Sequence, residues 1–253
     1  MSGFLSTFKR VETKYLLDGY QYNELMKRLE DIARVDEYGK TSILNIYYDT
    51  PSWELIKTSL DKPVYKEKLR LRTYGIPEDD TNAFVEIKKK YDGIVYKRRM
   101  NMPYKKAFDY LLGECKSGQD SQISREIDAF LDFYAQLEPA MAISYDRIAL
   151  KGIYDPDLRI TFDTNIRWRT DDLSLKYGNI GKDILEKDQC LMELKIVGAV
   201  PLDLAHIFSE IGIYKVSFSK YGKGFEDYMY AGKTAGVTHR NDGNSAKSKA
   251  AIA

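Results

Sequence analysis

The sequence predicts an α+β protein in which an antiparallel sheet of about eight strands carries helices on its outside. Three observations lead to this class. Several segments alternate apolar and charged residues with a period of two, as half-buried strands do. Other segments carry one apolar stripe at helical spacing. The chain also contains 20 tyrosines, and tyrosine is typical of half-buried strands.

Five of the predicted strands lie in the first part of the chain. Each places apolar residues on one face and charged residues on the other; in the first strand, Val11 and Tyr15 oppose Lys14. The dipeptide Asp92-Gly93 predicts a tight hairpin turn between the last two strands. The five strands cover residues 8–17, 43–49, 65–74, 83–91 and 94–102.

The second part of the chain adds three strands, which cover 141–150, 158–166 and 190–197. Helices are predicted where apolar residues recur every three or four positions, over 21–33, 104–112, 124–137, 202–211 and 225–230. Residues 171–187 show weak periodicity and are expected to form a long loop, while 216–221 are expected to be extended. Because no repeat or linker interrupts this pattern, we expect a single domain over 1–231 and a flexible tail over 232–253.

Composition excludes several classes of protein. The 253 residues suffice for a buried core, and no apolar run approaches the roughly 20 residues that span a bilayer. Residues 1–10 lack the apolar centre of a signal peptide. Two cysteines are too few for a disulfide scaffold or a cysteine-ligated zinc site, and two histidines disfavour a histidine-rich metal site. We therefore expect a cytoplasmic protein that does not depend on thiol chemistry.

The net charge of +1 conceals a segregation of charge on the predicted strands. A sheet with one solvated face is the ordinary reading of such strands. Cations directly opposite one another repel, however, so a shared basic face favours an anionic ligand. The cations on these polar faces are Arg10, Lys14, Lys68, Arg70, Arg72, Lys88, Lys97, Arg99, Arg147, Arg159 and Lys195; the few carboxylates are chiefly Glu12, Glu86, Asp163 and Glu193.

A closed barrel of about eight strands could enclose this basic face as a lumen. Arginine matches phosphate oxygens in two-pronged fashion, lysine adds point charge, and a few carboxylates suit a divalent metal on a phosphate chain. We therefore infer a triphosphate or polyphosphate site lined by strands. A phosphate-binding loop is not an alternative, because the Gly232-Lys233-Thr234 segment lacks the first glycine of a Walker A motif, having Asp227 in its place.

Seven short motifs, each weak alone, together resemble a known family. They are RVETKY at 10–15, KLRLR at 68–72, FVEIK at 84–88, YDR at 145–147, RITFD at 159–163, MELK at 192–195 and FSKY at 218–221. In this order they resemble the triphosphate tunnel metalloenzymes, or CYTH superfamily. Within that superfamily they are most similar to the VTC domain, the polyphosphate polymerase domain of the vacuolar transporter chaperone complex.

The resemblance implies an eight-stranded antiparallel tunnel that binds triphosphate or polyphosphate and uses Mn²⁺ or Mg²⁺. Triphosphatases of the superfamily typically begin with ExExK, whereas Arg10 here replaces the first Glu, and Glu12 and Lys14 remain. This departure disfavours two-metal hydrolysis and favours the VTC type. The membrane segments and sensor domain of the eukaryotic proteins are not carried over, so a membrane-protein partner cannot be read from this chain.

On this resemblance, each candidate residue receives a role. Catalytic contacts to the phosphoryl oxygens are expected from Arg70, Arg72, Lys88, Arg147, Arg159 and Lys195. Substrate phosphates would also be held by Lys14, Lys97, Arg99, Tyr145, Ser219 and Lys220. Glu193 is the foremost metal ligand, with Glu12 and Glu86 as further candidates. The structural alternatives are ion pairs between strands for the cations, and spacing of the cations for Glu12 and Glu86. Trp168 could stack a nucleotide base, although a surface aromatic is commoner.

Four functions remain open. A polyphosphate polymerase would transfer the γ-phosphoryl group of ATP in line to a growing chain, with no protein nucleophile. A triphosphatase of the same fold would use water instead of a phosphate acceptor. A binding module would hold polyphosphate without turnover. RNA binding would require the basic residues to lie on an outer surface, and we expect no nucleic-acid partner.

Overall fold

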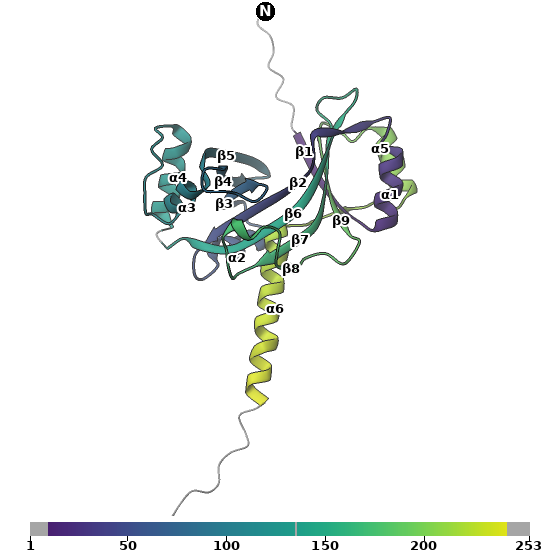
Figure 1. The fold of residues 1–253 in the computed structure, drawn as a ribbon. Helices are drawn as coiled ribbons and strands as arrows, with labels where there is room; N and C mark the ends of the chain where they lie inside the picture. The colour runs from purple at the N-terminus through teal and green to yellow at the C-terminus, as the bar shows by residue number, and fades with distance from the viewer. Residues whose placement is uncertain (1–9, 135, 242–253) are drawn as a thin grey trace, which may run out of the picture.

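The computed structural model describes residues 10–134 and 136–241. They form a mostly antiparallel sheet with helices around it, as Figure 1 shows. The strands are β1 (Arg10–Leu17), β2 (Ala33–Asp49), β3 (Tyr65–Tyr74), β4 (Asn82–Tyr91), β5 (Ile94–Pro103), β6 (Glu138–Gly152), β7 (Arg159–Arg169), β8 (Lys182–Asp183), β9 (Cys190–Val197) and β10 (Lys215–Val216). The helices are α1 (Gly19–Arg28), α2 (Glu54–Leu60), α3 (Tyr104–Leu111), α4 (Gln122–Phe133), the 3₁₀ helix η1 (Leu175–Tyr177), α5 (Leu202–Glu210) and α6 (Lys220–Asn241).

The predicted α+β class and antiparallel pairing are confirmed, but the strand count and the closure differ. The sheet has ten strands in the order β10-β1-β9-β7-β6-β2-β3-β4-β5, with β8 beside β7, and among the described residues its two edges do not pair. The edge strand β10 is only two residues long. The other edge, β5, is exposed over most of its length and carries Lys97, Arg98 and Arg99. Short and strongly charged edges disfavour strand addition, which explains why closure by hydrogen bonds is absent.

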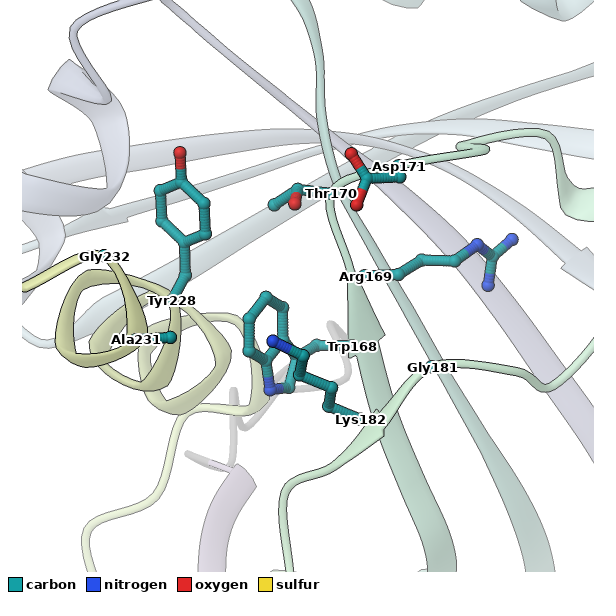
Figure 2. Close-up of a pocket in the computed structure, with 9 residues that line it drawn as sticks. All are labelled: Trp168, Arg169, Thr170, Asp171, Gly181, Lys182, Tyr228, Ala231 and Gly232. Atoms are coloured by element: carbon teal, nitrogen blue, oxygen red, sulfur yellow. The ribbon is translucent and has the colours of Figure 1, made fainter. Parts of the chain in front are cut away.

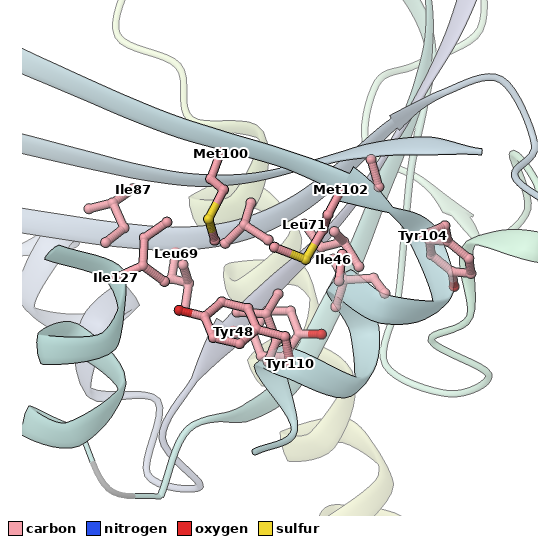
Figure 3. Close-up of a cluster of buried hydrophobic side chains, with 14 of the residues drawn as sticks. Ile46, Tyr48, Leu69, Leu71, Ile87, Met100, Met102, Tyr104, Tyr110 and Ile127 are labelled. Atoms are coloured by element: carbon pink, nitrogen blue, oxygen red, sulfur yellow. The ribbon is translucent and has the colours of Figure 1, made fainter. Parts of the chain in front are cut away.

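Two apolar cores lie on the outer face of the sheet. In the first, Leu69, Leu71 and Ile87 pack against α3 and α4, and Figure 3 shows Tyr110 and Ile127 closing over them. In the second, apolar side chains of β1, β7 and β9 pack against α1 and α5. Every second residue of these strands enters one of the two cores, so the residues between them point to the inner face of the sheet.

A third core lies at one end of the inner face, where β2, β6 and β7 meet the first turns of α6. It contains Tyr47, Trp168, Tyr221 and Phe225. Tyr47 stacks on Tyr221 with ring centroids 4.3 Å apart. Tyr221 in turn donates its hydroxyl proton to the buried Asp49 over 2.8 Å. Through these contacts, the start of α6 is held against the inner face.

Several boundaries differ from the sequence predictions. Helix α1 ends at Arg28 rather than at residue 33, because Ala33 already pairs in β2. Helix α2 and strand β8 were not predicted, and β8 lies inside the expected loop 171–187. The predicted tail begins at Gly232, but α6 continues through that residue to Asn241. The rest of the predicted tail, 242–253, lies outside the described residues, and one domain over 1–231 stays a prediction.

None of the helices in the described part of the chain combines the length and the apolar character that crossing a bilayer requires.

Candidate functional site

The sheet curves around the start of α6, which brings distant strands to one inner face. The β1 residue Lys14 donates through Nζ to the carbonyl oxygen of Phe218 over 2.9 Å. The β3 residue Lys68 donates through Nζ to Oγ of Ser219 over 3.4 Å. Because adjacent residues of one loop contact both strands, the charged faces of β1 and β3 point toward the same space. Two clusters of ion pairs lie on this inner face.

The Glu86 cluster consists of Glu86, Arg70, Arg72 and Lys97, all on β3, β4 and β5. Arg70 Nη2 lies 2.6 Å and Arg72 Nε 3.8 Å from Oε2 of Glu86, and Lys97 Nζ lies 2.8 Å from Oε1. The Glu86 side chain is only 1% exposed. Burial alone would raise the pKa of this carboxyl, but the three cations lower it to about 2. Glu86 is thus a permanent counter-charge that holds the cations in place.

The Glu193 cluster consists of Glu193, Asp163, Lys14, Arg147, Lys195 and Lys220, from β1, β6, β7, β9 and α6. Lys220 Nζ lies between the two carboxylates, 2.6 Å from Oδ2 of Asp163 and 3.2 Å from Oε1 of Glu193. Arg147 binds Asp163 with two parallel hydrogen bonds of 2.6 and 2.7 Å. Burial alone would lower the pKa of Lys220, but Asp163 and Glu193 outweigh burial and raise it.

The remaining contacts of the Glu193 cluster are longer. Lys14 Nζ lies 3.6 Å from Oε1 of Glu193, and Arg147 Nη2 and Lys195 Nζ each lie 3.8 Å from Oε2. Although burial would raise the pKa of Glu193, Lys220, Lys14 and Arg147 hold it well below its usual range. Glu193 is therefore charged at any physiological pH.

Ser219 and Lys220 owe their positions to the start of α6. Ser219 Oγ accepts from the backbone N–H of Gly222 over 3.1 Å, which caps the helix. The extended segment that the sequence predicts over 216–221 therefore ends earlier, since Lys220 is already helical. As the first helical residue, Lys220 points back toward the sheet and enters the Glu193 cluster.

Tyr145 connects the two clusters. Its hydroxyl accepts from Nη2 of Arg72 over 3.3 Å. On the other side, Lys220 Nζ lies 4.7 Å and Arg147 Cζ 5.2 Å from the centroid of its ring. The predicted phosphate contact Tyr145 is thus buried between cations of both clusters, where its negative ring face stabilises them.

Three predicted residues lie on the same face but outside the two clusters. Arg159 pairs with Asp36 over 3.0 Å, although the strand register places it directly opposite Lys195. Arg99 lies 4.8 Å above the ring of Phe84. Among the described residues, Glu12 forms an ion pair only with Lys195, at 3.9 Å, and is 38% exposed. Their predicted contacts with phosphate or metal stay predictions.

Lys88, like Lys68 and Arg99, has no ion pair within the described residues, and unlike those two it has no hydrogen bond to a side chain and no ring contact there either. Its position on β4 is directly opposite Lys68 and Lys97. The residue as a whole is exposed, the strand register places it on the inner face, and its ammonium group is partly desolvated there. Burial, Lys14 and Arg70 lower its pKa. A free ammonium among other cations is the arrangement that an incoming anion would neutralise.

Two residues that contribute to the inner face received no role in the sequence analysis: Tyr47 was not singled out, and Asp163 was named only as a carboxylate of the polar strand faces. Tyr47 accepts a 3.1 Å hydrogen bond from Nη1 of Arg70 and thereby orients that guanidinium. It comes from an apolar strand that carries no charge signal, so the sequence alone could not identify it. Asp163 stands on the polar face of its strand and in the RITFD motif, so its alternation was a usable signal. Its role as the main partner of Lys220 depends on tertiary structure.

The charge balance of the inner face strongly favours an anion. Even without Arg99 and Arg159, nine cationic side chains of the described residues face four carboxylates, which leaves a surplus of five positive charges. The cations are Lys14, Lys68, Arg70, Arg72, Lys88, Lys97, Arg147, Lys195 and Lys220, and the carboxylates are Glu12, Glu86, Asp163 and Glu193.

The carboxylates fit a divalent metal only in part. No group of three His, Cys, Asp or Glu side chains that could hold a metal occurs in the described part of the chain. Glu86 already has close cations at both oxygens, 2.6 Å from Oε2 and 2.8 Å from Oε1, although Oε1 makes no hydrogen bond of good geometry within the described residues. By contrast, the ion pairs of Glu193 that reach Oε2 are 3.8 Å long, so this oxygen retains coordinating capacity. The donor set thus suits a metal that is bound by one carboxylate and by the oxygens of a phosphate chain.

Substitutions of two cations on the inner face should differ in their effects on triphosphate binding and on stability. We expect Lys88→Ala to weaken triphosphate binding by about tenfold or more without lowering the melting temperature, since Lys88 has no ion pair to lose. Arg70→Ala should weaken binding and also destabilise the fold, because it leaves the buried Glu86 with fewer partners. Calorimetric titration and thermal unfolding of both variants check this. A Lys88→Ala protein that melts earlier but binds normally would contradict it.

We also expect triphosphate binding to take up a proton near pH 8. Burial together with Lys66, Lys88 and Lys14 lowers the pKa of Lys68 to about 8, and a bound polyanion would raise it again. The contribution of Lys68 to binding is thus complete below pH 8 and is lost as pH rises toward its pKa in the complex. Titrations in two buffers of different ionisation enthalpy should show less proton uptake for Lys68→Gln than for the wild type; equal uptake would disprove the assignment.

Two cavities lie away from the inner cation clusters. Figure 2 shows one of about 520 Å³ between the end of β7 and α6, lined among others by Trp168, Lys182 and Tyr228. None of the predicted site residues lines it. Trp168 is 4% exposed and packs in the third core, with Lys182 Nζ 5.1 Å from its ring centroid. Trp168 is therefore neither a surface aromatic nor free to stack a base.

The chain matches a known protein family in sequence and solved structures in fold. The VTC domain family matches residues 9–228 of the chain. No curated protein sequence matches it. Among solved structures, a proposed adenylyl cyclase from Hippeastrum with a dominant triphosphatase activity has a TM-score of 0.54 at 14% identity, covering 87% of this chain and 96% of that one. A proposed adenylate cyclase from Bacillus halodurans has a TM-score of 0.52 at 16% identity, covering 83% and 93%. At these identities the likeness shows the fold, which is the triphosphate tunnel fold.

Proposed function

Because the chain belongs to the VTC domain family, we propose that it is a polyphosphate polymerase that transfers the γ-phosphoryl group of ATP to a growing polyphosphate chain. One observation supports this most strongly, namely the surplus of cations that converges on the inner face from six strands and one helix. A basic face that serves RNA would lie on the outside of the sheet. Here the outer face is apolar and covered by helices.

The residues suggest how the transfer proceeds. Arg147 and Lys220 are held rigidly by Asp163, so they would receive the γ-phosphoryl oxygens without rearrangement. Arg70 and Arg72, held by Glu86, would bind the neighbouring phosphates. An oxygen of the terminal phosphate of the chain attacks the γ-phosphorus in line, the bond to the β–γ bridging oxygen breaks, and ADP leaves with that oxygen.

A divalent metal, Mn²⁺ or Mg²⁺, would be held by Glu193 together with phosphate oxygens and would neutralise charge on the phosphate chain. No residue of the inner face needs to act as a nucleophile. The cations would position the γ-phosphoryl group of ATP and the terminal phosphate of the chain for reaction with each other.

The experiment that tests the proposal separates transfer from hydrolysis. The purified protein is incubated with ATP and Mn²⁺ or Mg²⁺, with and without pyrophosphate or a short polyphosphate primer. Products are resolved on a gel for polyphosphate, and free phosphate is assayed in parallel. A ladder with ADP and little free phosphate is the expected result. Free phosphate without a ladder would establish a triphosphatase instead, and binding without either product would establish a polyphosphate-binding module.

A further inference from the structure

Six large apolar or aromatic side chains are exposed at the end of the sheet where β3 and β5 begin and β4 ends. This tip patch consists of Val64, Tyr65, Tyr91, Ile94, Val95 and Tyr96, which are between 44% and 65% exposed. The strand register places Tyr65, Tyr91, Ile94 and Tyr96 on one face of the sheet, since Tyr91 pairs with both Tyr65 and Ile94, while Val95 lies on the other face at the same end. Single exposed apolar residues are ordinary, but six at one end of a sheet are not.

The tip patch is a built feature of the fold. A two-residue turn joins β4 to β5, with φ of +44° at Asp92 and +78° at Gly93, as tight hairpins require. The backbone N–H of Asp92 donates to the carbonyl oxygen of Val64 over 3.0 Å, which ties this turn to the segment before β3. On the helix side, Tyr65 and Tyr134 both donate to the carboxylate of Glu67, at 2.6 and 2.9 Å. The patch is therefore presented on a rigid, protruding end.

The surroundings of the tip patch are basic. Lys90 pairs with Val95 and Lys89 with Tyr96, while Lys66 stands opposite Lys90 and Lys62 precedes Val64. Neither Lys62 nor Lys90 forms an ion pair within the described part of the chain. Nearby Glu67 is already bound by two tyrosines. Lys89 lies 4.0 Å from Oε2 of Glu67, whereas Lys62, Lys66 and Lys90 have no carboxylate partner within the described residues, so the tip patch is flanked by a net positive charge.

We propose that the tip patch binds the surface of an anionic lipid bilayer. Exposed Ile, Val and Tyr side chains enter the boundary between headgroups and acyl chains. The ammonium groups of the flanking lysines contact anionic headgroups, while their aliphatic stems lie against the apolar part of the bilayer. A free polyphosphate would use the lysines but would gain nothing from Ile94 or Val95. The same strands carry Lys68 and Lys88 on the inner face, so docking would place the substrate site close to the membrane surface.

The test is co-sedimentation of the full chain with vesicles. Vesicles of phosphatidylcholine mixed with phosphatidylserine should bind the protein in a salt-sensitive manner, whereas pure phosphatidylcholine should not. The double variant Ile94→Ser/Tyr96→Ser should lose about tenfold in vesicle affinity. Its matched control is Tyr38→Ser/Tyr154→Ser, which removes two tyrosines that are 71% and 89% exposed elsewhere. All four side chains are exposed, so thermal unfolding should be unchanged.

Four outcomes would overturn the proposal. The first two are absence of binding to phosphatidylserine vesicles and equal loss in both double variants. The third is concentration-dependent self-association that only the Ile94→Ser/Tyr96→Ser variant abolishes, which would assign the patch to a second copy of the chain. The fourth is a loss of affinity for soluble polyphosphate in that variant, which would assign the patch to the polyanion. None of these measurements requires turnover, so their failure would not bear on the proposed polymerase activity.

Discussion

Replacing Lys220 by methionine is expected to lower the free energy of unfolding by about 3 to 5 kcal/mol and to abolish phosphoryl transfer. Lys220 lies between Asp163 and Glu193, and its own side chain is only 9% exposed. Its removal leaves two carboxylates on the inner face with fewer cations, and Asp163 is completely buried. Because the desolvation cost of a buried charge is repaid only by its partner, the variant loses stability as well as a phosphate contact. Urea denaturation measures the first effect, and the ladder assay measures the second.

The control for this variant is Lys223→Met, one turn further along α6. Lys223 is 44% exposed and pairs only with the partly exposed Asp227, so this change should stay within about 0.5 kcal/mol of the wild type. The double variant Asp163→Asn/Lys220→Met should recover part of the lost stability but none of the activity, because it removes a buried charge that retains only Arg147 as its ion-pair partner among the described residues, without restoring the cation. If Lys220→Met were no less stable than Lys223→Met, the buried ion pairs would not have the importance assigned to them.

Replacing Glu193 by glutamine is expected to reduce metal-dependent turnover by about 100-fold or more and to strengthen metal-free triphosphate binding by about tenfold. The carboxylate holds a negative charge among Lys14, Arg147 and Lys220. Without that charge, the surplus of positive charge on the inner face increases, and an anion is attracted more strongly. At the same time, a carboxylate oxygen with coordinating capacity for a metal is lost.

Calorimetric titration with triphosphate in the presence of a chelator measures the change in metal-free binding. Turnover at varied metal concentration measures the loss of metal-dependent activity. Glu12→Gln is the matched control, because Glu12 is exposed and reaches only Lys195. It should change both quantities by less than about threefold. An unchanged metal dependence of the Glu193→Gln enzyme would show that Glu193 is not a metal ligand.

The strands could be predicted because their alternation records burial on one face. In β9, Met192, Leu194 and Ile196 enter the second core, while Glu193 and Lys195 face the inside, as the period of two requires. The same holds for β1 and β3. Helix ends were harder, because α1 stops where β2 captures Ala33 rather than where its apolar stripe ends. Helix α2 has seven residues, too few for its periodicity to be recognised.

The site could be predicted as a set of residues but not as an arrangement. Alternation placed the predicted strand cations on polar strand faces, and the motifs pointed to Ser219 and Lys220. Neither alternation nor the motifs could show that Arg159 would pair with Asp36 or that Glu86 would be enclosed by three cations. These contacts depend on cross-strand register and on the approach of strands that are far apart in the sequence. Tyr47 is the clearest case, since its role follows only from its contacts with Arg70 and Tyr221.

By itself, the sequence determined the antiparallel α+β class and the charged face of the strands, and it led to the prediction that this face binds phosphate, because strand periodicity and charge are local properties. Only the tertiary structure decided that the ten-stranded sheet stays open, that α6 brings Lys220 between Asp163 and Glu193, and that Lys88 remains unpaired within the described residues. The physical reason is that pairing between charges varies with distance over a few ångströms. Those distances are set by the packing of the three apolar cores and not by any one segment.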